Sequence, residues 1–181
     1  MNFHIEHRIW AALPALEAAV LDPARVDRLP SVSPFIRTAR VLTLHQEGHT
    51  VERRARMSAQ GLRAQVGPWL LLDDVTWDDH VVWDLRTHVG TFVIDPHLPE
   101  SLRSHVSCQG SYRLIADGPA VTIRAIEAEV EVAVPALGSA IREAIVRLLR
   151  IHFDHDVGLL TSLAHAHATE SPDGRICLTP V

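Results

Sequence analysis

The chain has 181 residues, of which 47% are hydrophobic and 22% charged, values that fit one globular domain and exclude a disordered chain. Its 22 acidic residues outnumber 17 basic residues, every one an arginine, and give a formal net charge of −5. No basic stripe interleaved with aromatic residues runs along the chain, so we expect no nucleic-acid partner.

The first residues alternate apolar and polar side chains, which predicts a half-buried strand over residues 2–10. This alternation is unlike a signal peptide, and no apolar run approaches the roughly 20 residues of a membrane span. Cys108 and Cys177 lie far apart in the sequence without metal-like spacing, so we expect reduced thiols. The sequence therefore predicts a cytoplasmic protein without an integral membrane segment.

Two short helices are predicted to follow the first strand. Residues 11–20 are rich in alanine and leucine at helical spacing, and Asp22-Pro23 is typical of an N-cap followed by a first-turn proline. Alternation then predicts strands over residues 35–45 and 51–59, joined by a hairpin turn at Gly48. We interpret the arginines of the second of these strands as an exposed face or a sheet edge. They are Arg53, Arg54 and Arg56.

The middle of the chain is harder to interpret. Residues 61–74 contain the apolar run 68–72, which predicts either a short helix or an irregular apolar plug. Strand patterns follow at 75–77 and over 80–94, where Gly90 indicates a bulge in one long, curved strand.

The last two strands are predicted at residues 106–115 and 121–134, with a turn over residues 116–119 between them. The second shows strict alternation, and we interpret its three glutamates as a solvent-exposed face. They are Glu127, Glu129 and Glu131.

One long helix is predicted over residues 137–166, with Gly158 as a weak point. One stripe along it comprises Ile141, Ala144, Ile145, Leu148, His152, His155 and Leu159. Residues 1–168 then form a single domain, and residues 169–181 a loosely docked tail.

This order of elements predicts an α+β fold, in which a curved antiparallel sheet of about six to seven strands wraps around the long C-terminal helix. Because the helices close only part of such a sheet, a cavity between helix and sheet is expected. Cavities of this kind hold apolar ligands.

Several short motifs occur in this order: Phe3-His4-Ile5-Glu6-His7, Val75-Thr76-Trp77, Trp83-Asp84, Gly90-Thr91-Phe92, Gln109-Gly110-Ser111-Tyr112 and Val134-Pro135-Ala136-Leu137-Gly138. Over residues 2–165 the chain thereby resembles the helix-grip superfamily of START lipid-transfer domains, birch-pollen allergens and polyketide cyclases, and within it a bacterial polyketide-cyclase-like branch. The resemblance implies binding of a hydrophobic ligand. It implies no catalytic residue, because the superfamily shares no single catalytic set.

We predict that aromatic and aliphatic side chains line the cavity and that two histidines provide polar contacts. These residues are Trp77, Trp83, Ile145, Leu148, His152 and His155. The expected ligand is a small hydrophobic or amphipathic molecule, lipid-like or polyketide-like, bound without a cofactor by a monomer or homodimer. His152 and His155 lie one helical turn apart but lack the further ligands of a zinc site, so no metal is predicted.

Two other functions stay open at this point. A polyketide cyclase or dehydratase needs an acid or base in the cavity, and His88, Asp84 and Arg86 share one strand face that His152 or His155 could approach. The opposite face carries Trp83 and is more apolar, so it is the better candidate for the interior. The other alternative is a structural or regulatory module that dimerises through a sheet edge and has a filled interior.

Overall fold

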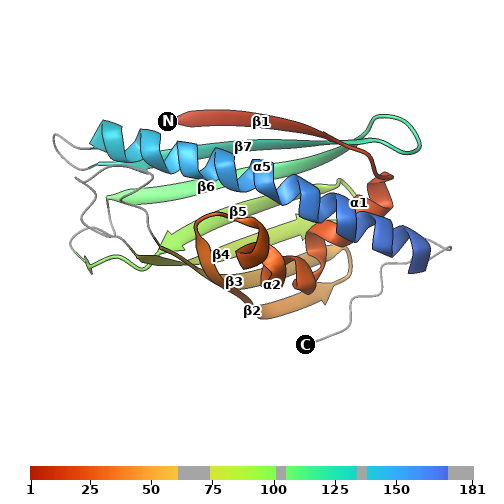
Figure 1. The fold of residues 1–181 in the computed structure, drawn as a ribbon, viewed down its shortest axis with the longest axis horizontal. Helices are drawn as coiled ribbons and strands as arrows, with labels where there is room; N and C mark the ends of the chain where they lie inside the picture. The colour runs from red at the N-terminus through yellow and green to blue at the C-terminus, as the bar shows by residue number, and fades with distance from the viewer. Residues whose placement is uncertain (61–73, 101–104, 134–137, 171–181) are drawn as a thin grey trace.

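In a computed structural model of the chain, the described residues are 1–60, 74–100, 105–133 and 138–170. Seven strands form one antiparallel sheet in the order β1-β7-β6-β5-β4-β3-β2, and the helices lie on one of its faces (Figure 1). The strands are β1 (Asn2–Ile9), β2 (Ile36–Glu47), β3 (Thr50–Ala59), β4 (Val75–Asp84), β5 (Val89–Pro96), β6 (Val106–Ala116) and β7 (Thr122–Val132). The helices are α1 (Leu13–Leu21), α2 (Pro23–Val32) and α5 (Gly138–Glu170).

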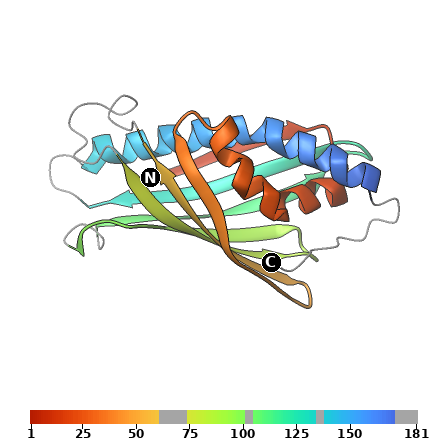
Figure 2. The ribbon, with the colours of Figure 1, turned by 60° about the horizontal axis from the view of Figure 1, so that its bottom comes forward.

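The predicted fold is confirmed. The sheet is strongly twisted and curves beneath α5, which crosses it as one unbroken rod, while α1 and α2 lie beside the rod on the same face (Figure 2). Helix α5 continues through Gly158, and the Asp22 carboxylate caps α2 by accepting a hydrogen bond from the Ala24 amide at 2.8 Å. None of the described helices is long and apolar enough to cross a membrane.

The predicted alternation sets the two faces of the sheet. In β7, Ile126 and Val130 are fully buried against the helices, whereas Glu127 and Glu131 are exposed on the outer face. The inward side chains form two apolar clusters, one around Trp83 under α1 and α2, and the other around Phe92 under the first half of α5. The predicted outer face of β7 is thus confirmed, with Glu129 half-buried between the two exposed glutamates.

Two glycines give cross-strand aromatic rings room on the inner face. Gly90 pairs with Trp83, and a Cβ atom at Gly90 would lie 2.3 Å from the indole Cε3. Gly110 pairs with Phe92, and a Cβ there would lie 2.3 Å from the Glu127 carbonyl oxygen and 2.6 Å from the phenyl ring. These glycines let the large rings lie flat over the neighbouring strand, which positions Trp83 and Phe92 in the interior.

The prediction of one long strand over residues 80–94 is wrong, because a turn over residues 85–88 divides this segment into β4 and β5. The Asp84 carboxylate accepts a hydrogen bond from the Arg86 amide at 2.8 Å, and His88 adopts a left-handed conformation with φ of 56°. Asp side chains stabilise such turns, and His tolerates positive φ better than most residues. With neither glycine nor proline at residues 85–88, the usual sequence signal for a turn is missing.

Other predictions concern residues that are not described. The segment 61–73 with Trp69, the residues 134–137 before α5, and residues 171–181 with Cys177 lie outside the described part. Residues 169 and 170 belong to α5 and not to the predicted tail.

Candidate functional site

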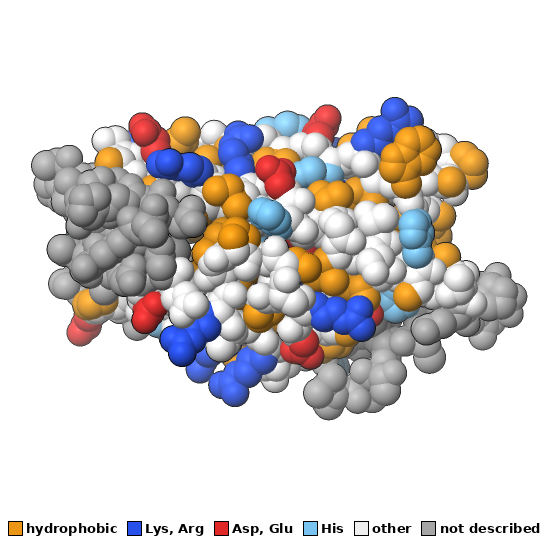
Figure 3. Space-filling view, viewed as in Figure 1, with side chains coloured by type: hydrophobic (Ala, Val, Ile, Leu, Met, Phe, Trp, Pro, Cys, Tyr) orange, Lys and Arg blue, Asp and Glu red, His pale blue; other side chains and the backbone are white. Residues whose placement is uncertain are grey.

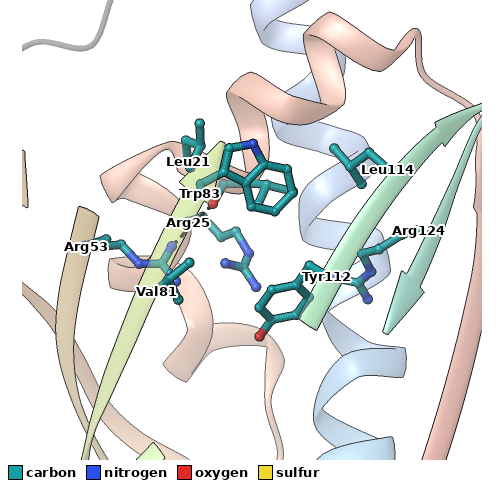
Figure 4. A pocket seen from close by; sticks show the side chains of 9 residues that line it. Leu21, Arg25, Arg53, Val81, Trp83, Tyr112, Leu114 and Arg124 are labelled. Carbon is teal, nitrogen blue, oxygen red and sulfur yellow. Dashed lines mark hydrogen bonds between the residues drawn. The ribbon is translucent and has the colours of Figure 1, made fainter. Parts of the chain in front are cut away.

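An enclosed space lies between the inner face of the sheet and the two short helices. Its volume is about 10 Å³, room for about one water molecule. Figure 4 shows Arg25 between Arg53 and Arg124, with Trp83 on one side and Tyr112 on the other. The lining residues are Val20, Leu21, Arg25, Arg53, Val81, Trp83, Tyr112, Leu114 and Arg124.

The largest polar feature of this interior is an Arg–Asp–Arg cluster formed by α2, β7 and α5. Asp156 is fully buried and accepts hydrogen bonds from Arg25 Nε at 3.0 Å and Nη2 at 2.8 Å, and from Arg124 Nη1 at 2.6 Å. Burial alone raises the pKa of Asp156, but the two guanidiniums lower it by more, so the pKa lies well below its ordinary value. Asp156 therefore stays ionised and joins three elements that are distant in the sequence.

A second buried pair joins the neighbouring strands β3 and β4. Arg53 Nη2 donates to Asp79 Oδ2 at 3.2 Å and Nη1 donates to the Val20 carbonyl oxygen at 3.3 Å. Arg53 is 4% exposed, so the prediction that it lies on an exposed face or edge is wrong. It shares its face with Val51 and Ala55, both buried, whereas Arg54 and Arg56 point outward. Strand periodicity decides its position, and its salt bridge compensates part of the burial cost.

Two of the buried guanidiniums retain an unused donor. Arg53 Nε and Arg124 Nε are buried and have no hydrogen-bond partner among the described residues. Burial lowers the pKa of both arginines, because Asp79 and Asp156 offset only part of the lost hydration. Burial also raises the pKa of the Tyr112 phenol, which therefore stays neutral near pH 7.

A third polar group lies at the end of the interior near the turn over residues 85–88. Glu17 of α1 is 4% exposed, and its Oε1 accepts a hydrogen bond from Trp83 Nε1 at 2.8 Å. The same oxygen lies 2.9 Å from Nδ1 of His88, whose side chain is 35% exposed. Glu17 thus satisfies the buried indole N–H and holds the indole ring over the space.

A chain of hydrogen bonds leads from the buried cluster to the surface through His7 of β1. Arg124 Nη2 lies 3.1 Å from His7 Nδ1, and His7 Nε2 lies 2.9 Å from the exposed carboxylate of Asp154. Because a guanidinium can only donate, His7 Nδ1 is the acceptor and Nε2 carries the proton. His7 therefore fixes the orientation of Arg124 from outside the interior.

Of the six residues predicted to line the cavity, Trp83 lines the enclosed space and the other five lie elsewhere. Trp83 is fully buried and lines the space. Trp77, Ile145 and Leu148 are half-buried and pack against the two apolar clusters beside it. His152 is half-buried with its Nδ1 inside the protein, whereas His155, one turn further along α5, is exposed. The stripe continues from His152 through Asp156, four residues on.

His152 makes the stability of the protein depend on pH. Burial lowers the pKa of His152 to about 4, against about 6.5 in an unfolded chain. Between these values the unfolded state binds more protons, so the free energy of unfolding falls as the pH falls from about 6.5 to about 4. We expect wild type to lose about 2 kcal/mol more over this range than His152→Gln, measured by urea denaturation at each pH.

The exposed neighbour supplies the control for that measurement. His155→Gln should retain the wild-type pH dependence, because His155 is exposed. An unchanged pH dependence in His152→Gln would show that a different group causes it.

A broad second hollow lies on the outer face of the sheet. Its volume is about 750 Å³, it is open to solvent, and it is lined by His4, Thr91, Gln109, Ser111, Glu127 and Glu129 among others. In the described part of the chain, no three His, Cys, Asp or Glu side chains come together as a metal site.

Comparison with known structures identifies the fold. A START superfamily protein from Mycobacterium smegmatis has a TM-score of 0.62 and 14% identity, over 90% of this chain and 98% of that one. The Zhui aromatase/cyclase from a Streptomyces species has a TM-score of 0.65 and 12% identity, over 94% and 98%. The chain has the helix-grip fold. A further helix-grip structure, norcoclaurine synthase from Thalictrum flavum in complex with dopamine and hydroxybenzaldehyde, has a TM-score of 0.58 and 12% identity, over 90% and 87%.

No protein-family model matches the sequence, and a search of curated proteins finds no significant relative. At the identities given above, the structural likeness establishes the helix-grip fold alone.

The buried charges of this helix-grip domain were missed by the sequence analysis, although strand periodicity contains a signal for some of them. Arg124 shares its face with Ile126 and Val130, and Asp79 shares its face with Val81 and Trp83. Charged residues are rarely buried, so residue type argued against these positions. For Arg25, on a helix, we find no comparable signal in the sequence.

Proposed function

We propose that the protein binds a small amphipathic molecule in the interior of the helix-grip domain, with the arginine cluster holding its polar end. The observation that carries the proposal is the set of buried arginines around the enclosed space, two of which retain an unused N–H. Burying ion pairs contributes little to stability, and apolar residues of similar size often stabilise a core more. Perturbed ionisable groups that line an interior space are instead typical of functional sites.

The apolar part of the ligand has suitable contacts beside these charges. Trp83 and Leu114 line the space directly, and the half-buried Leu148 packs against the same apolar cluster. The Thalictrum flavum neighbour, which shares the fold, was solved with two small aromatic molecules bound. This supports a ligand of similar, modest size.

The small volume of the space sets a condition on binding. A molecule larger than water enters only if side chains such as Tyr112 or Arg25 move, because about 10 Å³ is free. Because only molecules in the open state can bind, the apparent affinity is the intrinsic affinity multiplied by the open fraction. Weak or slow binding of small aromatic probes is therefore expected.

The small free volume also favours a second candidate, a structural module whose interior is filled and binds nothing small. The buried arginines oppose this candidate, since a purely structural core gains little from three cations. Binding measurements separate the two.

The proposal predicts that naphthalene-sized probes bind to the purified protein and raise its melting temperature, by an amount that grows with the logarithm of ligand concentration above the Kd. Leu114→Phe narrows the interior space and should weaken binding about tenfold, equivalent to about 1.4 kcal/mol. Ile115→Phe alters the adjacent side chain, which is 43% exposed on the outer face, and should leave binding unchanged. Native mass spectrometry and fluorescent-dye displacement measure both variants. Binding unaffected by Leu114→Phe, or no binding at all, would contradict the proposal.

A further inference from the structure

The groups around the enclosed space carry an excess of positive charge. Three guanidiniums line it, from Arg25, Arg53 and Arg124, and all three side chains are more than nine-tenths buried. Two carboxylates, Asp79 and Asp156, pair with them. Three cations and two anions leave one positive charge.

The other ionisable groups nearby leave this balance unchanged. Tyr112 and His152 are neutral near pH 7, as their shifted pKa values require. The next buried carboxylate, Glu17, bonds to Trp83 and His88 and, among the described residues, to none of the three arginines. Charges of both signs are interspersed over the face that Figure 3 shows, and the chain as a whole has a formal net charge of −5.

The unused hydrogen-bonding atoms of the cluster favour an anionic ligand, as its excess positive charge does. Arg53 Nε and Arg124 Nε are donors without a partner among the described residues, and a guanidinium has no acceptor. They come from strands on opposite sides of Arg25 (Figure 4). A ligand group with two or more acceptor oxygens could receive both donors, whereas an ammonium would meet three guanidiniums, which can only donate.

We infer that the ligand carries a single negative charge on a delocalised oxyanion, such as a carboxylate, which binds among these three arginines. This inference rests on the proposed function and narrows it to a chemical class. An anion at this position neutralises the excess charge and satisfies donors that burial otherwise leaves unpaired.

The test compares near-isosteric anionic and neutral probes on the intact protein at pH 7. The pairs are benzoate with benzamide, 2-naphthoate with 2-naphthamide, and decanoate with decanamide, titrated by calorimetry. We expect the anion of at least one pair to bind about tenfold or more tightly than its amide, because hydrogen bonds to a charged acceptor are about twice as strong as neutral ones.

Three variants test whether the buried charge balance sets this preference. Asp79→Asn removes one interior anion and should tighten anion binding several-fold, a gain that unfolding cannot produce. Arg53→Gln removes one cation and should abolish most of the preference, with circular dichroism confirming the fold. Arg40→Gln, which alters an exposed arginine of β2, controls for the overall charge and should bind like wild type.

The outcomes distinguish failure of the anion assignment from failure of the binding proposal. Equal binding of anions and amides, or a preference unchanged in both Asp79→Asn and Arg53→Gln, overturns the anion assignment and leaves the binding proposal standing. Failure of every probe in every pair overturns the binding proposal and the inference with it. A preference lost equally in Arg40→Gln also overturns the assignment, since it would reflect the net charge of the protein.

Discussion

Asp156→Asn is expected to lower the free energy of unfolding by about 3–5 kcal/mol, the usual cost of removing one partner from a buried ion pair. Asp156 is fully buried and accepts three hydrogen bonds from Arg25 and Arg124. Asparagine has nearly the same shape, but it leaves two buried cations without a counter-charge and turns an N–H group toward guanidinium donors. Since small domains are stable by only about 5–15 kcal/mol, this loss leaves a marginal protein.

Urea denaturation of the variant measures this loss, and the same helix provides a matched control. Asp154→Asn makes the same chemical change at a carboxylate whose side chain is 67% exposed and that contacts His7, so it should cost less than about 1 kcal/mol. Equal effects of the two variants would contradict the role assigned to the Arg25–Asp156–Arg124 cluster.

Gly110→Ala is expected to destabilise the protein by about 2–3 kcal/mol, at the upper end of the usual cost of overpacking a core. The new Cβ would lie 2.3 Å from the Glu127 carbonyl oxygen of β7 and 2.6 Å from the Phe92 ring. The carbonyl belongs to the backbone of a paired strand and cannot rotate away. Relief therefore requires β6 to move relative to β7.

The control changes another glycine to alanine where space is free. Gly158 lies within α5 with nothing within 4 Å of the site of a new Cβ, so Gly158→Ala should stabilise the protein by about 0.5–1 kcal/mol. Thermal unfolding followed by circular dichroism measures both variants. A neutral Gly110→Ala would show that the sheet yields here more easily than its packing suggests.

The order of elements was predictable because each depends on local patterns. Period-two alternation in β1 and β7 indicated strands and their buried faces, and the apolar stripe of α5 indicated one long helix. The turn at His88 was missed because it depends on the Asp84 side chain and on a left-handed histidine. The residues around it favour strands, so the local sequence contained no turn signal.

The charged interior was not predicted because its pairs form between distant segments. Arg25 and Asp156 are 131 positions apart, and Arg124 and Asp156 are 32 apart. Nothing local in a sequence shows which arginine meets which aspartate, and residue type places both outside. His155 was favoured over Asp156 for the same reason, although the helical spacing from His152 fits Asp156 well.

The most direct measurement of the proposed site is a titration of isotope-labelled protein with 2-naphthoate, followed in ¹H–¹⁵N spectra of the backbone amides and the arginine Nε–H groups. Arg53 and Arg124 Nε are buried without a partner among the described residues, so a bound oxyanion should shift both resonances together and saturably. The exposed Arg40 should not respond. Shifts confined to residues of the outer hollow, such as Gln109 and Ser111, with Arg53 and Arg124 unchanged, would contradict an interior binding site.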